Sequence, residues 1–325
     1  MTILSVRPIL RSRHARRPGL VLSTYIMTYP RWIHAEGKTH RAHSIDEEIE
    51  VYLRTPSLMD SSALSRNAAS SRAIPVERVI QDVIDNPADP LFWGENQRGM
   101  QAWHELTGDR LDHAKGLWEE SKQKAIDMAW QMARAKVHKQ IVNRILEPYS
   151  HIRTLVSATE WKNYIALRAH PDAEPHIRML AESLKVELER EDNIQTLRPD
   201  QWHMPFTDIT DKDGEPVILD GAVDSSEAMM NSLKLSVSRN ASLSYKTVDG
   251  IDMSLDRACR LHDDLISRIP IHASPAEHTA RADHLLKEPV HAGGMLIEWC
   301  NQNQHANFRG FRQYRHMIEG NTMIG

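Results

Sequence analysis

The sequence predicts an α+β protein in which long helices pack on a small mixed or antiparallel sheet. Residues 3–30 have the composition of two strands around a turn, and several later segments carry apolar residues at three- and four-residue spacing. Short polar breaks separate these segments. The 325 residues show no internal repeat, low-complexity tract or flexible linker, so we expect one enlarged domain spanning 1–325.

The first predicted element is a β-hairpin. Its second strand, "LVLSTYIMTY" (Leu20–Tyr29), is rich in β-branched and aromatic residues, and "RRPG" (Arg16–Gly19) before it predicts a turn. The basic run Arg11–Arg17 is typical of a hairpin with arginines on its solvent side. It could also be a nucleic-acid-binding arm, which would show steeply salt-dependent binding.

Helices are predicted after the hairpin. The first starts at Pro75, with Val76, Val79, Ile80 and Val83 on one face. Longer helical regions cover about 112–147 and 173–190, and a last one follows "DGIDMS". The polar stretch Asp208–Glu227 predicts a turn or hairpin and then a helix N-cap. The apolar stripes are expected in the core: Ile126, Trp130, Ala133, Val137, Ile141, Ile145; Ile177, Leu180, Leu184, Leu188; Leu255, Cys259, Leu261, Leu265, Ile266.

Composition excludes several classes of protein. Hydrophobic residues at 41% and charged residues at 26% are typical of globular proteins. A net charge of −4 disfavours nucleic acid as a partner. No apolar run is long enough to span a bilayer, no secretory signal is recognisable, and the two cysteines allow no disulfide framework. We therefore expect a cytoplasmic protein, without a metal because no HExxH-like spacing occurs.

Four polar clusters stand out from this background. Each combines an arginine with hydroxyl, amide or imidazole groups, which suits phosphate oxygens and the carbonyl edge of a base. Taken singly, any of them could be an ordinary polar stretch in contact with solvent. The clusters are "EGKTHR" (Glu36–Arg41), "SRNAASSRAIP" (Ser65–Pro75), "NR" (Asn143–Arg144) and "EWKNYIALRAHPDA" (Glu160–Ala173).

Together these clusters resemble the motifs of the flavin-dependent thymidylate synthases. "THR" followed by "SRNAASSR" resembles the family signature R-H-R-x-x-S-x-N-x-x-S-x-R, and "NRILEP" and "NYIALRAHPDAEPHI" resemble two later motifs. "RNASLSYKT" (Arg239–Thr247) and "HASPAEH" (His272–His278) resemble segments that precede the signature in the usual member. Here they follow it, so the chain resembles an enlarged, circularly permuted branch of the family found in phages. Residues 1–195 would carry the signature and 196–325 the permuted part.

The resemblance implies a homotetrameric enzyme, in the host cytoplasm if a phage encodes it. It would methylate dUMP to dTMP, with FAD as hydride source and methylenetetrahydrofolate and NADPH as co-substrates. Arg168 would act in catalysis, next to the pyrimidine carbonyl, where a permanently charged donor stabilises developing negative charge. The remaining implied site residues are Glu36, Ser70, Arg72 and Arg144 for the nucleotide, and His40, Arg41, Ser65, Asn67, Asn163, Ser274 and His278 for FAD.

Three departures from the family pattern leave alternatives open. Thr39 replaces an arginine, Ala68 stands at a usual glutamate, and Glu36 stands at a usual glutamine. Glu36 could accept from a cytosine amino group, so the product could come from dCMP or be hydroxymethylated. The chain could also be a non-catalytic nucleotide-binding assembly module.

Two further segments have open roles. The insertion 42–64 contains a capping box at Ser44 and Glu47, which predicts a short helix, either a lid or a surface excursion. The segment "NFRGFRQYR" (Asn307–Arg315) reads as a core strand with solvated arginines or, alternatively, a wall on the folate side.

Overall fold

The structure is a computed structural model. It describes residues 2–35, 65–68 (backbone only), 74–98, 102–207, 223–244, 253–267, 271–287 and 298–318. The insertion 42–64 and the predicted turn or hairpin at 208–222 lie outside these residues.

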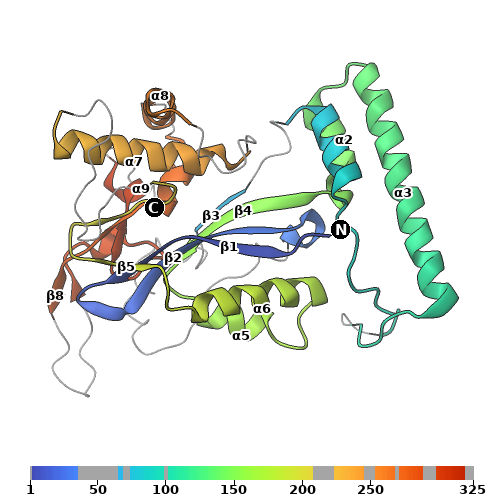
Figure 1. Cartoon of the computed structure of the whole chain (residues 1–325), viewed down its shortest axis with the longest axis horizontal. Helices are drawn as coiled ribbons and strands as arrows, with labels where there is room; N and C mark the ends of the chain where they lie inside the picture. Colours follow the sequence, from blue (N-terminus) through green and yellow to red (C-terminus); the bar gives the residue numbers. More distant parts are fainter. Residues whose placement is uncertain are drawn as a thin grey trace.

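A five-stranded sheet forms the centre of the molecule (Figure 1), with the strand order β3-β4-β2-β1-β5. All neighbouring strands are antiparallel except β5, which runs parallel to β1, so the sheet is mixed as the sequence predicts. Most of the length of β2 is buried, in keeping with its β-branched and aromatic residues. The strands are β1 (Ser5–His14), β2 (Arg17–Pro30), β3 (Ser65–Ala68), β4 (His151–Ala158) and β5 (Ile194–Leu197).

The hairpin turn lies earlier than the sequence predicts. His14 pairs with Arg17, so the turn residues are Ala15 and Arg16, and Pro18 and Gly19 belong to β2. The register then shifts, with Arg13 opposite Val21. This irregularity accommodates Pro18, which has no N–H to donate to the ladder.

The arginines of the hairpin are not all solvated. Arg11 is only 6% exposed, and its guanidinium donates to the carbonyl of Leu188 at 3.1 Å and to that of Arg190. These carbonyls belong to the C-terminal end of α6 (Pro175–Glu189), where a cation is favourable. The hairpin interpretation is confirmed, but its solvent-side placement is wrong for Arg11.

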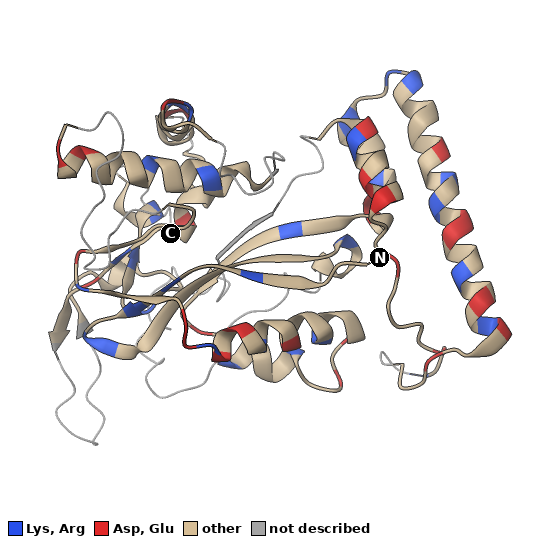
Figure 2. Cartoon of the chain, in the orientation of Figure 1, with Lys and Arg blue, Asp and Glu red and all other residues tan. Residues whose placement is uncertain are grey.

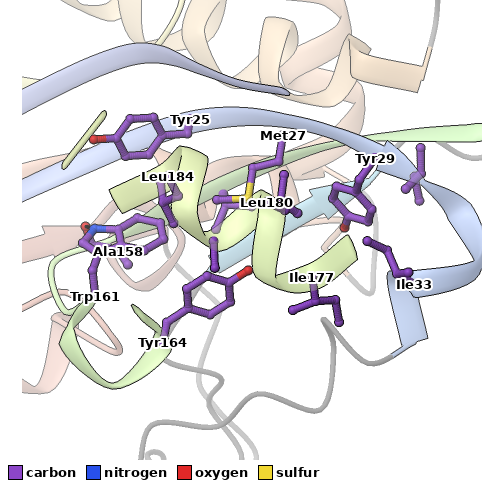
Figure 3. Packing of buried hydrophobic residues seen from close by; sticks show 13 residues of the cluster. Tyr25, Met27, Tyr29, Ile33, Ala158, Trp161, Tyr164, Ile177, Leu180 and Leu184 are labelled. Atoms are coloured by element: carbon purple, nitrogen blue, oxygen red, sulfur yellow. Dashed lines mark hydrogen bonds between the residues drawn. The ribbon is translucent and has the colours of Figure 1, made fainter. Parts of the chain in front are cut away.

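One face of the sheet is covered by α5 (Lys162–Arg168) and α6, as Figure 1 shows. The predicted helix at 173–190 is confirmed, and it begins where the Glu174 carboxylate accepts from the backbone N–H groups of His176 and Ile177, both at 2.9 Å. Leu180 and Leu184 pack against Tyr25 and Met27 of β2 (Figure 3). This cluster is the largest of the described hydrophobic clusters.

A second helical group lies at one end of the sheet (Figure 1). It consists of α2 (Val76–Asp85), α3 (Gly108–Arg134) and α4 (Lys139–Ile145). The four predicted core residues of α2 are all buried. Acidic and basic side chains alternate along α3 (Figure 2), which is typical of a solvated helix surface.

The prediction of one helix over 112–147 is wrong. Lys136, with a φ of 60°, interrupts it between α3 and α4. The interruption changes the phase of the buried stripe. Ile141, predicted in the core, is 51% exposed, whereas Val142 and Leu146 are fully buried.

On the opposite side of the sheet lies α7 (Ser225–Ala241), and α8 (Leu255–Ser267) packs on α7, farther from the sheet (Figure 1). The predicted N-cap is Asp224, whose carboxylate accepts from the Glu227 N–H at 2.8 Å. The remaining described elements are short. They are η1 (Arg31–Ile33), η6 (Glu147–Tyr149), η7 (Ser242–Ser244), η8 (Ser274–His278), η9 (Gln302–Gln304), β6 (Trp202–His203), β7 (Ala280–Ala282), β8 (Leu285–Lys287), β9 (Glu298–Trp299), β10 (Phe311–Gln313) and α9 (Tyr314–Met317).

The core-strand interpretation of Asn307–Arg315 is confirmed only for Phe311–Gln313, which form β10, and Arg309 and Arg315 are not simply solvated because they pair with Glu160 and Glu277. Phe308 and Phe311 are fully buried, and β10 pairs with β7. The neighbouring carboxylate of Asp283 is also fully buried, and it accepts from the Asn301 backbone N–H and the His305 Nε2, both at 2.8 Å. These bonds attach the C-terminal segment to the rest of the fold. No helix among the described residues has the length and apolar character needed to cross a bilayer.

Candidate nucleotide-binding site

A pocket of about 200 Å³ opens where the ends of β2 and β4 meet the second helical group. Arg31 and Arg153 line it, together with Ile74, Asn143 and Leu243. Four parts of the chain that are far apart in sequence therefore contribute to one pocket.

The described residues that line the pocket include two arginines, Arg31 and Arg153, and one carboxylate, Asp82. Burial lowers the pKa of Arg31, and this effect is opposed by Glu147, whose carboxylate lies 3.8 Å from the guanidinium. The charge of Arg144 also lowers the pKa of Arg31, so the two guanidiniums lie near each other. Arginine keeps its charge at neutral pH. A phosphate placed between such groups would relieve their repulsion and form charge-assisted hydrogen bonds.

Two of the predicted nucleotide-binding motifs meet at this pocket. The Asn143 side chain is 1% exposed, and its Nδ2 donates to the backbone carbonyl of Ile74 at 2.9 Å. Asn143 directly precedes Arg144, which is exposed in the last turn of α4. Ile74 follows Arg72 by two residues. The bond therefore ties the flank of the Ser65–Pro75 cluster to the "NR" cluster.

The C-terminal half of the chain reaches the same region. η7 contributes Leu243, which lines the pocket and packs on Ile26 and Leu155 of the sheet. η8 packs against β3, the strand that carries the start of the signature. η7 and η8, which belong to the two segments whose resemblance is to motifs upstream of the signature, therefore lie beside β3 in space.

A buried chain of hydrogen bonds crosses this face of the sheet. Thr24 Oγ1 lies at its centre, 2.6 Å from Ser157 Oγ and 2.8 Å from His203 Nε2. We call the whole series the Ser–His network. Its members, in bonding order, are Gln195, Ser12, His203, Thr24, Ser157 and His278.

His278, predicted to contact FAD, ends the Ser–His network. Its Nδ1 lies 2.9 Å from Ser157 Oγ, and the side chain is fully buried. Burial lowers the pKa of His278 to about 3, so the imidazole is neutral at physiological pH. Burial also lowers the pKa of His203 to about 3, with a smaller contribution from His278. Ser274, the other predicted residue of η8, is exposed.

Arg168 and Asn163 lie on the other face of the sheet. Both belong to α5, which packs with β4 through Ile152, Val156 and Ala158, whereas Ser157 faces His278. The Arg168 Nε is buried and has no hydrogen-bond partner among the described residues. Neither residue lines the pocket, so one chain does not bring Arg168 there. A site shared between subunits stays a prediction.

The structure leaves the other predicted site residues untested. Glu36, His40, Arg41, Ser70 and Arg72 lie outside the described residues. For Ser65 and Asn67 only the backbone is described, and its register pairs Ser65 with Ser157 and Asn67 with Leu155.

Sequence reasoning missed Arg31 and Arg153 in the pocket and Thr24 and Ser157 in the Ser–His network. Nothing in the sequence around these two arginines indicated a pocket, because isolated arginines are common on protein surfaces. For the two hydroxyl residues the sequence did contain an indication. Thr24 and Ser157 interrupt apolar strands, and polar residues at buried strand positions need partners.

Comparisons with known proteins add little to this picture. The sequence matches no family model and no curated protein. Among solved structures, the UMP/dUMP methylase PolB from Streptomyces cacaoi bound with 5-Br dUMP is 13% identical, with a TM-score of 0.35 over 54% of this chain and 67% of that chain. The same methylase bound with 5-Br UMP is 13% identical, with a TM-score of 0.36 over 60% and 91%. Similarity this weak carries no argument about fold or function.

Proposed function

We propose that this protein binds a pyrimidine nucleoside monophosphate with its phosphate at the Arg31 pocket and methylates dUMP to dTMP. The observation that carries the proposal is the bond from Asn143 Nδ2 to the Ile74 carbonyl. It brings together two motifs that the family resemblance assigns to nucleotide binding. The pocket beside this bond carries Arg31 and Arg153, which supply the charge that a phosphate requires.

The phosphate end of the site follows from these positions. Arg144, at the exposed end of α4, is free to approach a phosphate in the pocket, and Ser70 and Arg72 precede Ile74 in the chain. Arg31 lines the pocket and is half-buried, so its charge is less screened than on the surface. Arg168 would reach the pyrimidine carbonyl of a nucleotide bound to a neighbouring subunit.

The residues near β3 fit a flavin. His278 Nε2 is buried and has no hydrogen-bond partner among the described residues, and η8 lies against the signature strand. A ring with several carbonyl oxygens and unprotonated nitrogens offers acceptors to such a donor. Reduced FAD would supply the hydride. We assign His40, Arg41, Ser65, Asn67, Ser274 and His278 to FAD, and Asn163, on the other face of the sheet, to the FAD of a neighbouring subunit. Methylenetetrahydrofolate and NADPH are the co-substrates.

The test is a single-turnover reaction with purified protein, FAD, methylenetetrahydrofolate and NADPH, using dUMP and dCMP in separate reactions. We expect dTMP from dUMP, identified by exact mass. A hydroxymethylated product, or any product from dCMP, would contradict methylation of dUMP and would support the alternative hydroxymethylation or dCMP reaction. If the protein binds no FAD and forms no product, the result supports the alternative of a non-catalytic nucleotide-binding assembly module.

The phosphate site has its own test. Arg31→Gln and Arg153→Gln should each weaken dUMP binding about tenfold or more in equilibrium dialysis, because each removes a charged donor. Arg134→Gln, at the exposed end of α3, is the matched control and should bind dUMP like the wild type. Equal affinity in all four proteins would exclude the pocket as the phosphate site.

A further inference from the structure

The direction of the hydrogen bonds in the Ser–His network can be worked out from one end. Gln195 Nε2 donates to Ser12 Oγ at 2.8 Å. Ser12 is fully buried, and its other side-chain partner among the described residues is His203 Nδ1, at 2.7 Å. The Ser12 hydroxyl proton must therefore point to His203. In the reverse direction that proton would be buried without an acceptor, at a cost of about 1–3 kcal/mol.

The remaining donors follow in turn. His203 accepts at Nδ1 and is neutral, so its proton is on Nε2 and is donated to Thr24 Oγ1. Thr24 then donates to Ser157 Oγ, and Ser157 donates to Nδ1 of His278. His278 must therefore carry its own proton on Nε2.

We propose that Ser12, Thr24, Ser157, His203 and Gln195 are positioning residues that fix His278 as a neutral imidazole protonated on Nε2. This nitrogen donates to a carbonyl oxygen or unprotonated ring nitrogen of the ligand bound beside β3. The donor assignment rests on the proposed function, whereas the tautomer rests on the hydrogen bonds alone. The chemistry required of the ligand is a neutral acceptor on a heteroaromatic ring, which both flavins and pyrimidines have.

The location of His278 Nε2 supports a role in binding. A buried N–H donor without an acceptor destabilises a fold, and His278 Nε2 is fully buried without an acceptor among the described residues. The network behind it is long and fully occupied, so it holds the ring and leaves Nε2 as the unused position. The sheet register also pairs Ser157, which bonds His278, with Ser65 of the signature strand.

Reversing the network from its far end is the sharpest test. Gln195→Glu replaces an amide donor with a carboxylate that can only accept, at a half-buried position four hydroxyl or imidazole groups away from His278. Ser12 would then donate to residue 195 and accept from His203, and every later bond would reverse. His278 would carry its proton on Nδ1, although nothing near it has changed.

The readout is the pair of ring ¹⁵N signals of His278 in sedimented full-length protein, measured by magic-angle-spinning NMR with labelled histidine. The His278→Gln spectrum identifies the signals. We expect a proton on Nε2 in the wild type and on Nδ1 in Gln195→Glu. Thr196→Glu adds the same charge at an exposed neighbouring position and should leave the wild-type tautomer. Thr24→Val should remove the preference for one tautomer, and Thr24→Ser should restore it.

FAD alone and dUMP alone form the two ligand arms. The ligand that accepts from His278 should shift its Nε2 signal and should bind Gln195→Glu at least about tenfold more weakly than wild type. A wild-type proton on Nδ1, or a tautomer unaffected by Gln195→Glu and Thr24→Val, would overturn the positioning role. A ligand that binds without shifting the Nε2 signal or losing affinity in Gln195→Glu would overturn the donor role. If neither ligand binds the wild type, the proposed function fails, and the tautomer results still decide the positioning role.

Discussion

Mild acid should destabilise this protein through two histidines of the Ser–His network. Burial lowers the pKa of His203 and of His278 to about 3, from an unperturbed value of 6.5. Between these values the unfolded chain binds protons that the folded chain does not. Stability is therefore complete above pH 6.5 and decreases as the pH falls toward about 3.

The size of the effect follows from the two pKa values. A pH of about 5 is roughly 1.5 units below the pKa that each histidine has in the unfolded chain. Each pH unit in this range corresponds to about 1.4 kcal/mol per histidine. The two together should lower the free energy of unfolding by about 4 kcal/mol relative to about pH 7.5. Asp283, whose pKa is lowered to about 2, loses its contribution only at a lower pH and does not affect this window.

Urea unfolding followed by tryptophan fluorescence at a series of pH values measures this slope. Near pH 5 it should correspond to an uptake of at least about two protons on unfolding. His203→Gln should remove about half of the four-kilocalorie effect, whereas His104→Gln, at an exposed position, should leave it unchanged. A free energy of unfolding that is constant within about 1 kcal/mol over this range would refute the reasoning.

Three further predictions concern packing, the C-terminal segment and the pocket. Leu184→Ala should lower the free energy of unfolding by about 2–5 kcal/mol, because the side chain is fully buried; Val186→Ala on the same helix is 61% exposed and should change it little, as urea titration will show. Asp283→Ala should cost about 3 kcal/mol or more in thermal or urea unfolding, since it leaves buried donors such as His305 Nε2 unpaired. Arg144→Ala should raise the KM for the nucleotide about tenfold or more without lowering the melting temperature, because the side chain is exposed; an unchanged KM would remove it from the site.

The sequence by itself determined the elements whose signals are local. The hairpin, α2 and α6 were predicted because a strand or helix of this kind is set by neighbouring residues, such as the apolar stripe from Val76 to Val83. The break at Lys136 was not predicted, because the apolar pattern continues through it and a left-handed residue leaves no such trace. The burial of Arg11 was also missed, since its partners are carbonyls of a helix far along the chain.

The candidate site depends even more on contacts between distant parts of the chain. The residue types that suit a nucleotide phosphate were visible in the sequence, but the tertiary structure decided that Asn143 meets Ile74 and that η8 meets β3. It also decided that Ser12 bonds His203, 191 residues later in the chain. Hydrogen bonds of this kind depend on the order and register of the sheet, which are set by packing of the whole chain, whereas helix and strand periodicity depends only on residues a few positions apart.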